Sequence, residues 1–122
     1  NGQPDKNCTP GQTLTVPVVG LCSPSYIWPE VDDNTALEIY RQYGIVNRDG
    51  WSIQHYMPLI LGGSNDITNL YPMPAEPRPG YIEREKATQK LKELMCEGKI
   101  TLEVAQYTIQ HDWQSKPALY TR

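Results

Sequence analysis

The pattern of apolar positions predicts a helix over residues 81–97. Apolar side chains recur there at intervals of three and four among charged residues, which is the spacing of one helix face. The apolar members are Ala87, Leu91, Leu94 and Met95. Gly98 is the expected end of this helix, because glycine readily takes the left-handed conformation that follows many helices.

A second helix is expected after Gly98. Thr101 is placed to cap it, because a threonine oxygen can accept a hydrogen bond from the free N–H groups of a first helical turn. Its apolar stripe consists of Leu102, Ala105, Ile109 and Trp113. Two neighbouring helices that each carry one apolar stripe should pack together as a hairpin.

An earlier helix is predicted over residues 34–44. Thr35 and Glu38 have the spacing of a capping box, Asn34 is an alternative cap, and Gly44 is the expected stop. Before this helix, we expect an irregular arm over residues 1–33 that is pinned by a disulfide. Prolines interrupt regular structure there, at Pro4, Pro10, Pro17, Pro24 and Pro29.

The middle of the chain predicts a β-hairpin with a long connecting loop. Turn-forming residues cluster at 47–50 and at 62–66, and an apolar run lies between them at 56–61. Residues 69–71 can form the returning strand. Together with the helices, this hairpin predicts an α+β fold.

Length and composition fit one domain over residues 1–122. A chain of 122 residues with 39% apolar and 20% charged residues is typical of a globular protein. No stretch approaches the roughly 20 apolar residues of a membrane helix, so we expect no membrane span. We also expect a monomer. The formal charge of −3 speaks mildly against a nucleic-acid partner, although a basic strip can lie on an acidic body.

The most informative stretch is residues 55–72. It contains His55, then Pro-Leu at 58–59, Gly-Gly at 62–63 and an Asn-Leu pair that begins at Asn69, fourteen residues beyond the histidine. This pattern resembles the HNH, or His-Me finger, nuclease family. The likeness continues through residues 94–100 and 105–113, and the opening Cys-Thr-Pro-Gly is similar to small exported bacterial members, so the resemblance covers nearly the whole chain.

The resemblance implies a ββα-metal finger over residues 45–97, followed by a helix and tail over 98–122. It also implies an endonuclease that hydrolyses phosphodiester bonds in nucleic acid, with DNA favoured over RNA. His55 would be the general base, since its near-neutral pKa suits proton abstraction from water, and Asn69 would hold the hairpin loop. The implied cofactor is a divalent metal, Mg with Mn or Zn as alternatives, which would neutralise charge on the reacting phosphate.

The sequence departs from the family at the metal ligands. The residue before the catalytic histidine is usually an acid and here is Gln54, whose amide oxygen is a weaker ligand. On the following helix, Arg84, Glu85 and Thr88 stand where relatives carry a Lys-Asp pair and a Glu. The predicted metal ligands are therefore Gln54 and Glu85. A catalytically degenerate HNH-fold binding or interaction module is the alternative.

Basic side chains near the start of the helix over 81–97 form a candidate nucleic-acid-binding strip. Its members are Arg78, Arg84, Lys86 and Lys90. The resemblance places the phosphate backbone against this strip. The other interpretation is a solvated helix face, since glutamates are interspersed among the basic residues.

Three cysteines are too few and too irregularly spaced for a zinc site of the CxxC type. One disulfide and one free thiol is the simplest expectation. Cys22 is expected to pair with Cys8, because the loop between them is short and proline-rich, and a link from Cys22 to Cys96 is the rival. The chain begins without an initiator Met, which favours a secreted or periplasmic protein or a trimmed chain. An unrelated exported domain, in which the motif is a coincidence of turn residues, is a third hypothesis.

Overall fold

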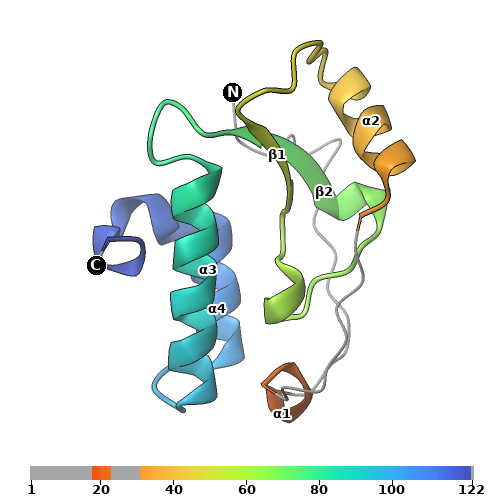
Figure 1. The fold of residues 1–122 in the computed structure, drawn as a ribbon. Coiled ribbons are helices and arrows are strands. Elements are labelled where there is room, and N and C mark those ends of the chain that lie inside the picture. Colours follow the sequence, from red (N-terminus) through yellow and green to blue (C-terminus); the bar gives the residue numbers. More distant parts are fainter. Residues whose placement is uncertain (1–17, 23–30, 122) are drawn as a thin grey trace.

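Helices surround a two-stranded antiparallel sheet in the computed structural model, which describes residues 18–22 and 31–121 (Figure 1). The main elements are α1 (Val18–Leu21), α2 (Asp33–Gln42), β1 (Trp51–His55), β2 (Leu70–Pro74), α3 (Tyr81–Cys96) and α4 (Leu102–Tyr107). Shorter turns of helix are Leu59–Leu61, Ile67–Asn69, Thr108–Asp112, Trp113–Ser115 and Pro117–Leu119. The mixture of helices and antiparallel strands is that of an α+β fold.

The hairpin of β1 and β2 lies between α2 and the pair formed by α3 and α4 (Figure 1). Its register places Trp51 opposite Pro74 and His55 opposite Leu70. The predicted returning strand and long connecting loop are confirmed. The apolar run over 56–61 belongs to that loop, since Pro58 has no N–H to donate to a strand ladder.

The predicted pair of C-terminal helices is confirmed. α3 ends before Gly98, whose φ of +78° is left-handed, and α3 and α4 lie side by side (Figure 1). Thr101 caps α4, because its Oγ1 accepts a hydrogen bond from the N–H of Val104 at 3.1 Å. The predicted stripes supply buried residues to the core at Ala87, Leu91, Met95, Ala105, Ile109 and Trp113.

The helix predicted over 34–44 is α2, and its left-handed stop at Gly44 is confirmed by a φ of +71°. The predicted cap was wrong. The chain enters the helix at Asp32, whose Oδ1 accepts from the N–H of Thr35 at 2.8 Å, and that aspartate takes the place predicted for Asn34 or Thr35.

The predicted disulfide partner of Cys22 was also wrong. Cys22 is bonded to Cys96 at the end of α3, 74 residues away in sequence, while Cys8 lies outside the described residues. The reason is tertiary packing: Leu21 is fully buried in the core, which brings its neighbour against α3. Loop-closure entropy rises only slowly with loop length and is easily outweighed by such packing.

The arm predicted over residues 1–33 is only partly described. α1 shows that it contains one short helical turn, and the predictions for residues 1–17 and 23–30 fall outside the described residues. No helix in the described part of the chain is both long and apolar enough to cross a membrane.

Candidate functional site

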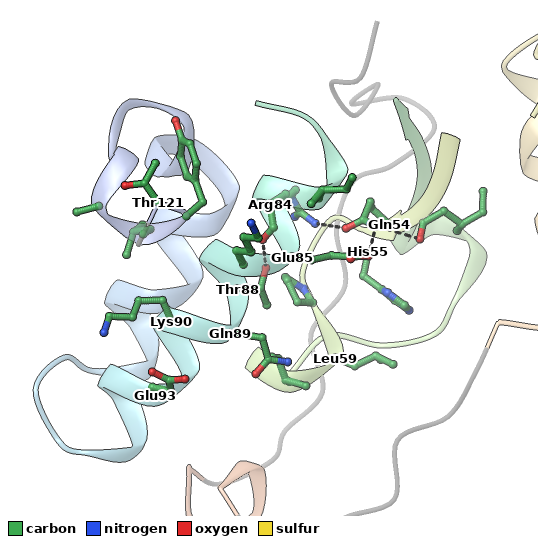
Figure 2. A pocket seen from close by; sticks show the side chains of 18 residues that line it. Gln54, His55, Leu59, Arg84, Glu85, Thr88, Gln89, Lys90, Glu93 and Thr121 are labelled. Atoms are coloured by element: carbon green, nitrogen blue, oxygen red, sulfur yellow. Dashed lines mark hydrogen bonds between the residues drawn. The ribbon is translucent and has the colours of Figure 1, made fainter. Parts of the chain in front are cut away.

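His55 lies at the end of β1 and lines a cleft of about 1060 Å³ (Figure 2). One wall of the cleft is β1 with the start of the loop that follows it. The opposite wall is α3, and residues 118–121 near the C-terminus complete the lining. The His55 ring is half-buried, so one part of it is held by protein and another part borders the cleft.

The hydrogen bonding of His55 indicates which of its ring nitrogens carries a proton. Nε2 lies 2.7 Å from Oδ1 of Asn65, and an amide oxygen can only accept, so Nε2 carries the proton. In the neutral ring Nδ1 then keeps its lone pair, and Nδ1 has no hydrogen-bond partner among the described residues. Burial lowers the pKa of His55, the Asn65 bond opposes this, and the charge of Arg84 lowers it further. The imidazole is therefore neutral at neutral pH.

Asn69 holds the loop that carries the site. Its side chain is 0% exposed and makes three hydrogen bonds across the loop. Oδ1 accepts from the N–H of Met57 at 2.9 Å, while Nδ2 donates to the carbonyl of Met57 at 2.9 Å and of Ser64 at 2.7 Å. The buried asparagine thus ties the chain two residues after His55 to the segment that contains Asn65.

The glycine pair at 62–63 allows this loop to close tightly. A Cβ built on Gly63 would lie 1.7 Å from the carbonyl oxygen of Met57, which no side chain could tolerate. Gly62 has a φ of +95°, a left-handed conformation, and the N–H of Gly63 donates to the carbonyl of Pro58 at 2.9 Å. This close approach returns the chain toward β1 and brings Asn65 to His55.

Gln54 sits between two charged residues of α3 (Figure 2). Its Oε1 accepts from Nη1 of Arg84 at 3.3 Å, and its Nε2 donates to Oε2 of Glu85 at 3.1 Å and to Oγ of Ser52 at 3.2 Å. The amide therefore links a guanidinium to a carboxylate. Gln54 is buried, whereas Glu85 is exposed, so the chain of bonds runs from the interior to the cleft.

Arg84 is buried, with 2% of its surface exposed. Its Nη2 donates to the carbonyl of Tyr56 at 3.0 Å, and its guanidinium lies 5.7 Å from the centre of the Tyr71 ring. Among the described residues, no carboxylate forms an ion pair with it. The Arg84 guanidinium thus borders the cleft and is surrounded by carbonyl oxygens and an aromatic face.

The predicted metal ligands do not fit a divalent cation in this arrangement. The side-chain oxygen of Gln54 is already bonded to a cation, and Glu85 accepts from the Gln54 amide. Within the described ranges, no group of three His, Cys, Asp or Glu side chains could hold a metal ion. A dication between these groups would also face the Arg84 guanidinium, and like charges repel strongly away from water. The Thr88 hydroxyl donates to the carbonyl of Arg84 at 2.8 Å.

The predicted basic strip is divided among three environments. Lys86 and Lys90 are exposed on α3 and line the cleft. Arg78 is exposed outside it and pairs with Glu83 at 3.0 Å, and Arg84 is buried rather than part of a surface strip. The cleft therefore brings together Gln54, His55, Arg84, Glu85, Lys86 and Lys90.

Sequence reasoning missed Asn65 and the C-terminal wall of the cleft at 118–121. Asn65 belongs to the turn after the glycine pair, where an asparagine is ordinarily explained by turn chemistry alone. The signal that could have identified it was its position inside the motif stretch of residues 55–72. The C-terminal wall carries no motif, because its place depends on how the helices pack.

No protein-family model matches this chain, and no curated protein and no solved structure matches it either. The residues and their geometry are therefore the basis for the function considered next.

Proposed function

We propose that this chain is an endonuclease of the HNH type that hydrolyses phosphodiester bonds in nucleic acid. The single observation that carries the proposal is the state of His55. Its ring borders a cleft, Asn65 fixes the proton on Nε2, and Nδ1 has no partner among the described residues and is left to accept a proton.

The reaction uses His55 as general base. A water molecule in the cleft attacks phosphorus while its proton passes to Nδ1 of His55, which forms one P–O bond. The bond between phosphorus and one ester oxygen breaks, and the departing oxygen takes a proton from solvent. The Asn65 oxygen stabilises the imidazolium that forms, because it accepts from the protonated Nε2.

The order of elements around His55 also supports the proposal. β1, β2 and α3 follow one another in the chain, as in a ββα finger, and the third hypothesis of a coincidental motif predicted no hairpin and helix there. Asn69 binds the loop in the manner expected for the middle residue of the HNH motif. Lys86 and Lys90 border the same cleft and could contact phosphates.

The test is cleavage of supercoiled plasmid DNA, and of a single-stranded RNA in parallel, by the purified full chain. The assay is run once with Mg²⁺ and once without it. We expect the wild type to nick the plasmid DNA. His55→Ala should lose the activity, whereas His111→Ala, which changes the exposed histidine outside the cleft, should keep it. If the wild type cleaves neither the plasmid DNA nor the RNA, the proposal is contradicted.

A binding or interaction module without catalysis is the second candidate. Two observations favour it: Gln54 is hydrogen-bonded to both Arg84 and Glu85, and Thr88 is hydrogen-bonded within its own helix. Neither position carries the acid of an active metal site. In that case labelled DNA should bind with a change in fluorescence anisotropy, without cleavage. For both candidates we also propose that the protein is secreted or exported, is a monomer and prefers DNA over RNA.

A further inference from the structure

The described part of the chain contains an unusual cation. Arg84 is 2% exposed and has no ion pair with any described carboxylate. Burying a charge without an ion pair is costly, so the surroundings must compensate it. They do so with two neutral oxygens, from the Gln54 side chain and the Tyr56 backbone, and with the face of Tyr71.

The location of this cation is as informative as its burial. Arg84 borders the cleft that His55 lines, and its two bonded partners, Gln54 and Tyr56, are the residues on either side of His55 in the chain. The guanidinium is therefore attached to the same piece of backbone that carries the proposed base. Two hydrogen bonds fix its position relative to His55, whereas the guanidinium of an exposed arginine would be free to move.

The contacts of Gln54 fit a residue that holds the Arg84 guanidinium better than they fit a metal ligand. A neutral amide can accept from a guanidinium and donate to a carboxylate at once, which is how Gln54 joins Arg84 to Glu85. An aspartate at position 54 would instead neutralise Arg84 directly. With the amide at position 54, Arg84 has no directly bonded carboxylate among the described residues, and the Glu85 carboxylate is held one amide away from it.

We propose that the Arg84 guanidinium supplies the positive charge that a divalent cation provides in metal-dependent nucleases, so that phosphodiester hydrolysis at His55 proceeds without a metal ion. This inference rests on the proposed function. The fixed charge stabilises the extra negative charge that gathers on the phosphoryl oxygens as the water oxygen bonds to phosphorus. The bonds made and broken and the two proton transfers are those of the hydrolysis described above.

The experiment compares nicking of supercoiled plasmid by the disulfide-intact full chain in metal-free buffer containing EDTA and in buffer containing Mg²⁺ or Mn²⁺. We expect equal rates in the two buffers, within a few-fold. Arg84→Gln should lower kcat by about 10²- to 10³-fold in EDTA with little change in KM, which is the loss typical of removing one group that stabilises transition-state charge.

Two variants separate charge from folding. Arg84→Lys keeps the charge without the guanidinium fork and should recover part of the kcat lost in Arg84→Gln. Arg41→Gln makes the same substitution on the exposed face of α2, far from the cleft lining, and should leave the rate unchanged. If Arg84→Gln does not fold, as judged by circular dichroism, the wild-type comparison in EDTA decides whether hydrolysis needs a metal ion. The kcat of Arg84→Lys relative to wild type then decides whether hydrolysis depends on the group at position 84, and a wild-type kcat in Arg84→His, which weakens the fixed charge, would overturn the inference.

Each outcome has one meaning. Cleavage in EDTA that depends on His55 and on the charge at position 84 supports the inference. Cleavage that EDTA abolishes and Mg²⁺ or Mn²⁺ restores would overturn it while leaving the proposed nuclease function intact. No cleavage of the plasmid or of the single-stranded RNA in any buffer would overturn both. Equal kcat in Arg84→Gln and wild type in EDTA would also overturn the inference.

Discussion

At the scale of single residues, the site depends on the His55 imidazole, whose two nitrogens differ in their hydrogen bonding. Asn65 occupies Nε2 of His55 and leaves Nδ1 as the basic nitrogen. Burial and the neighbouring Arg84 charge both favour the neutral ring. A side chain that is neutral, oriented and beside a cleft has the properties that a general base needs near pH 7.

The lowered pKa of His55 predicts how stability depends on pH. The folded-state pKa lies below the 6.5 of an ordinary histidine, so in the window between the two values the unfolded chain binds more protons. The free energy of unfolding should therefore fall as the pH falls from 6.5 through that window. His55→Gln removes this contribution, and the difference in Tm between wild type and variant should shrink as the buffer is made more acidic. A constant difference would contradict the predicted shift.

A second prediction at this scale concerns Asn69. Asn69→Ala would leave the N–H and carbonyl of Met57 and the carbonyl of Ser64 buried without these bonds. We expect a loss of about 3 kcal/mol or more in the free energy of unfolding, measured by urea denaturation, since each unsatisfied buried group costs roughly 1–3 kcal/mol.

The matched control is Asn47→Ala, on an exposed turn where the side chain accepts one hydrogen bond, from the N–H of Asp49 at 3.0 Å. It should cost less than about 1 kcal/mol, as is usual at the surface. Similar losses in the two variants would show that the loop does not depend on its buried asparagine.

At the scale of elements, the loop between β1 and β2 positions the chemistry. It leaves β1 at His55, turns back at the glycine pair and returns through Asn69 to β2. The loop is therefore part of the site rather than a connection alone. Its shape depends on a contact between two backbones, at Gly63 and Met57.

Gly63→Ala tests that contact. Because the new Cβ would meet the Met57 carbonyl oxygen at 1.7 Å, the loop must open, and we expect a loss of more than about 2 kcal/mol in the free energy of unfolding together with a lower rate in the proposed plasmid-nicking reaction. Gly50→Ala is the control, since Gly50 has a φ of +79° but nothing within 4 Å of an added Cβ. It should cost only about 1 kcal/mol from backbone strain and should not alter the site. Equal effects would argue against the close approach.

Elements with strong local signals could be predicted from the sequence, and contacts between distant residues could not. The face of α3, the cap at Thr101 and the stop at Gly98 depend on neighbours within a turn or two, so periodicity and capping chemistry identify them. Arg84 shows the limit of such reasoning. Helical spacing places it on α3, but only the packing of the hairpin reveals that this arginine is buried.

The candidate site was predicted to a similar extent. His55, Gln54 and Glu85 were identified from the motif and lie in one cleft, whereas the contact of Asn65 with His55 requires the loop to fold back. The hydrogen bonds of Gln54 to Arg84 and Glu85 could not be predicted from the sequence either, since they join residues about thirty positions apart.

At the scale of the whole molecule, the disulfide joins the N-terminal arm to the C-terminal helices. The bond from Cys22 to Cys96 encloses most of the described chain, including α2, the hairpin and α3. Closing a loop of this length stabilises the folded state by about 4 kcal/mol in the chain-entropy model. The link also holds Leu21 in the core.

Peptide mapping without reduction should find Cys22 linked to Cys96. Replacing both by alanine should lower the free energy of unfolding by roughly 2–5 kcal/mol, measured by chemical denaturation. Cys8→Ser should leave the mapped link unchanged, because Cys22 has another partner. A map that joins Cys22 to Cys8 would contradict the fold as described.

The central claim is that the imidazole of His55 takes a proton from the attacking water, and chemical rescue tests it most directly. His55→Gly removes the ring and leaves space for a free imidazole beside the cleft. We predict that the variant fails to nick plasmid DNA and that added imidazole restores nicking in a saturable manner, most effectively at a pH where imidazole is neutral. A His55→Gly variant that cleaves as fast as the wild type without imidazole would contradict the assignment of His55 as the base.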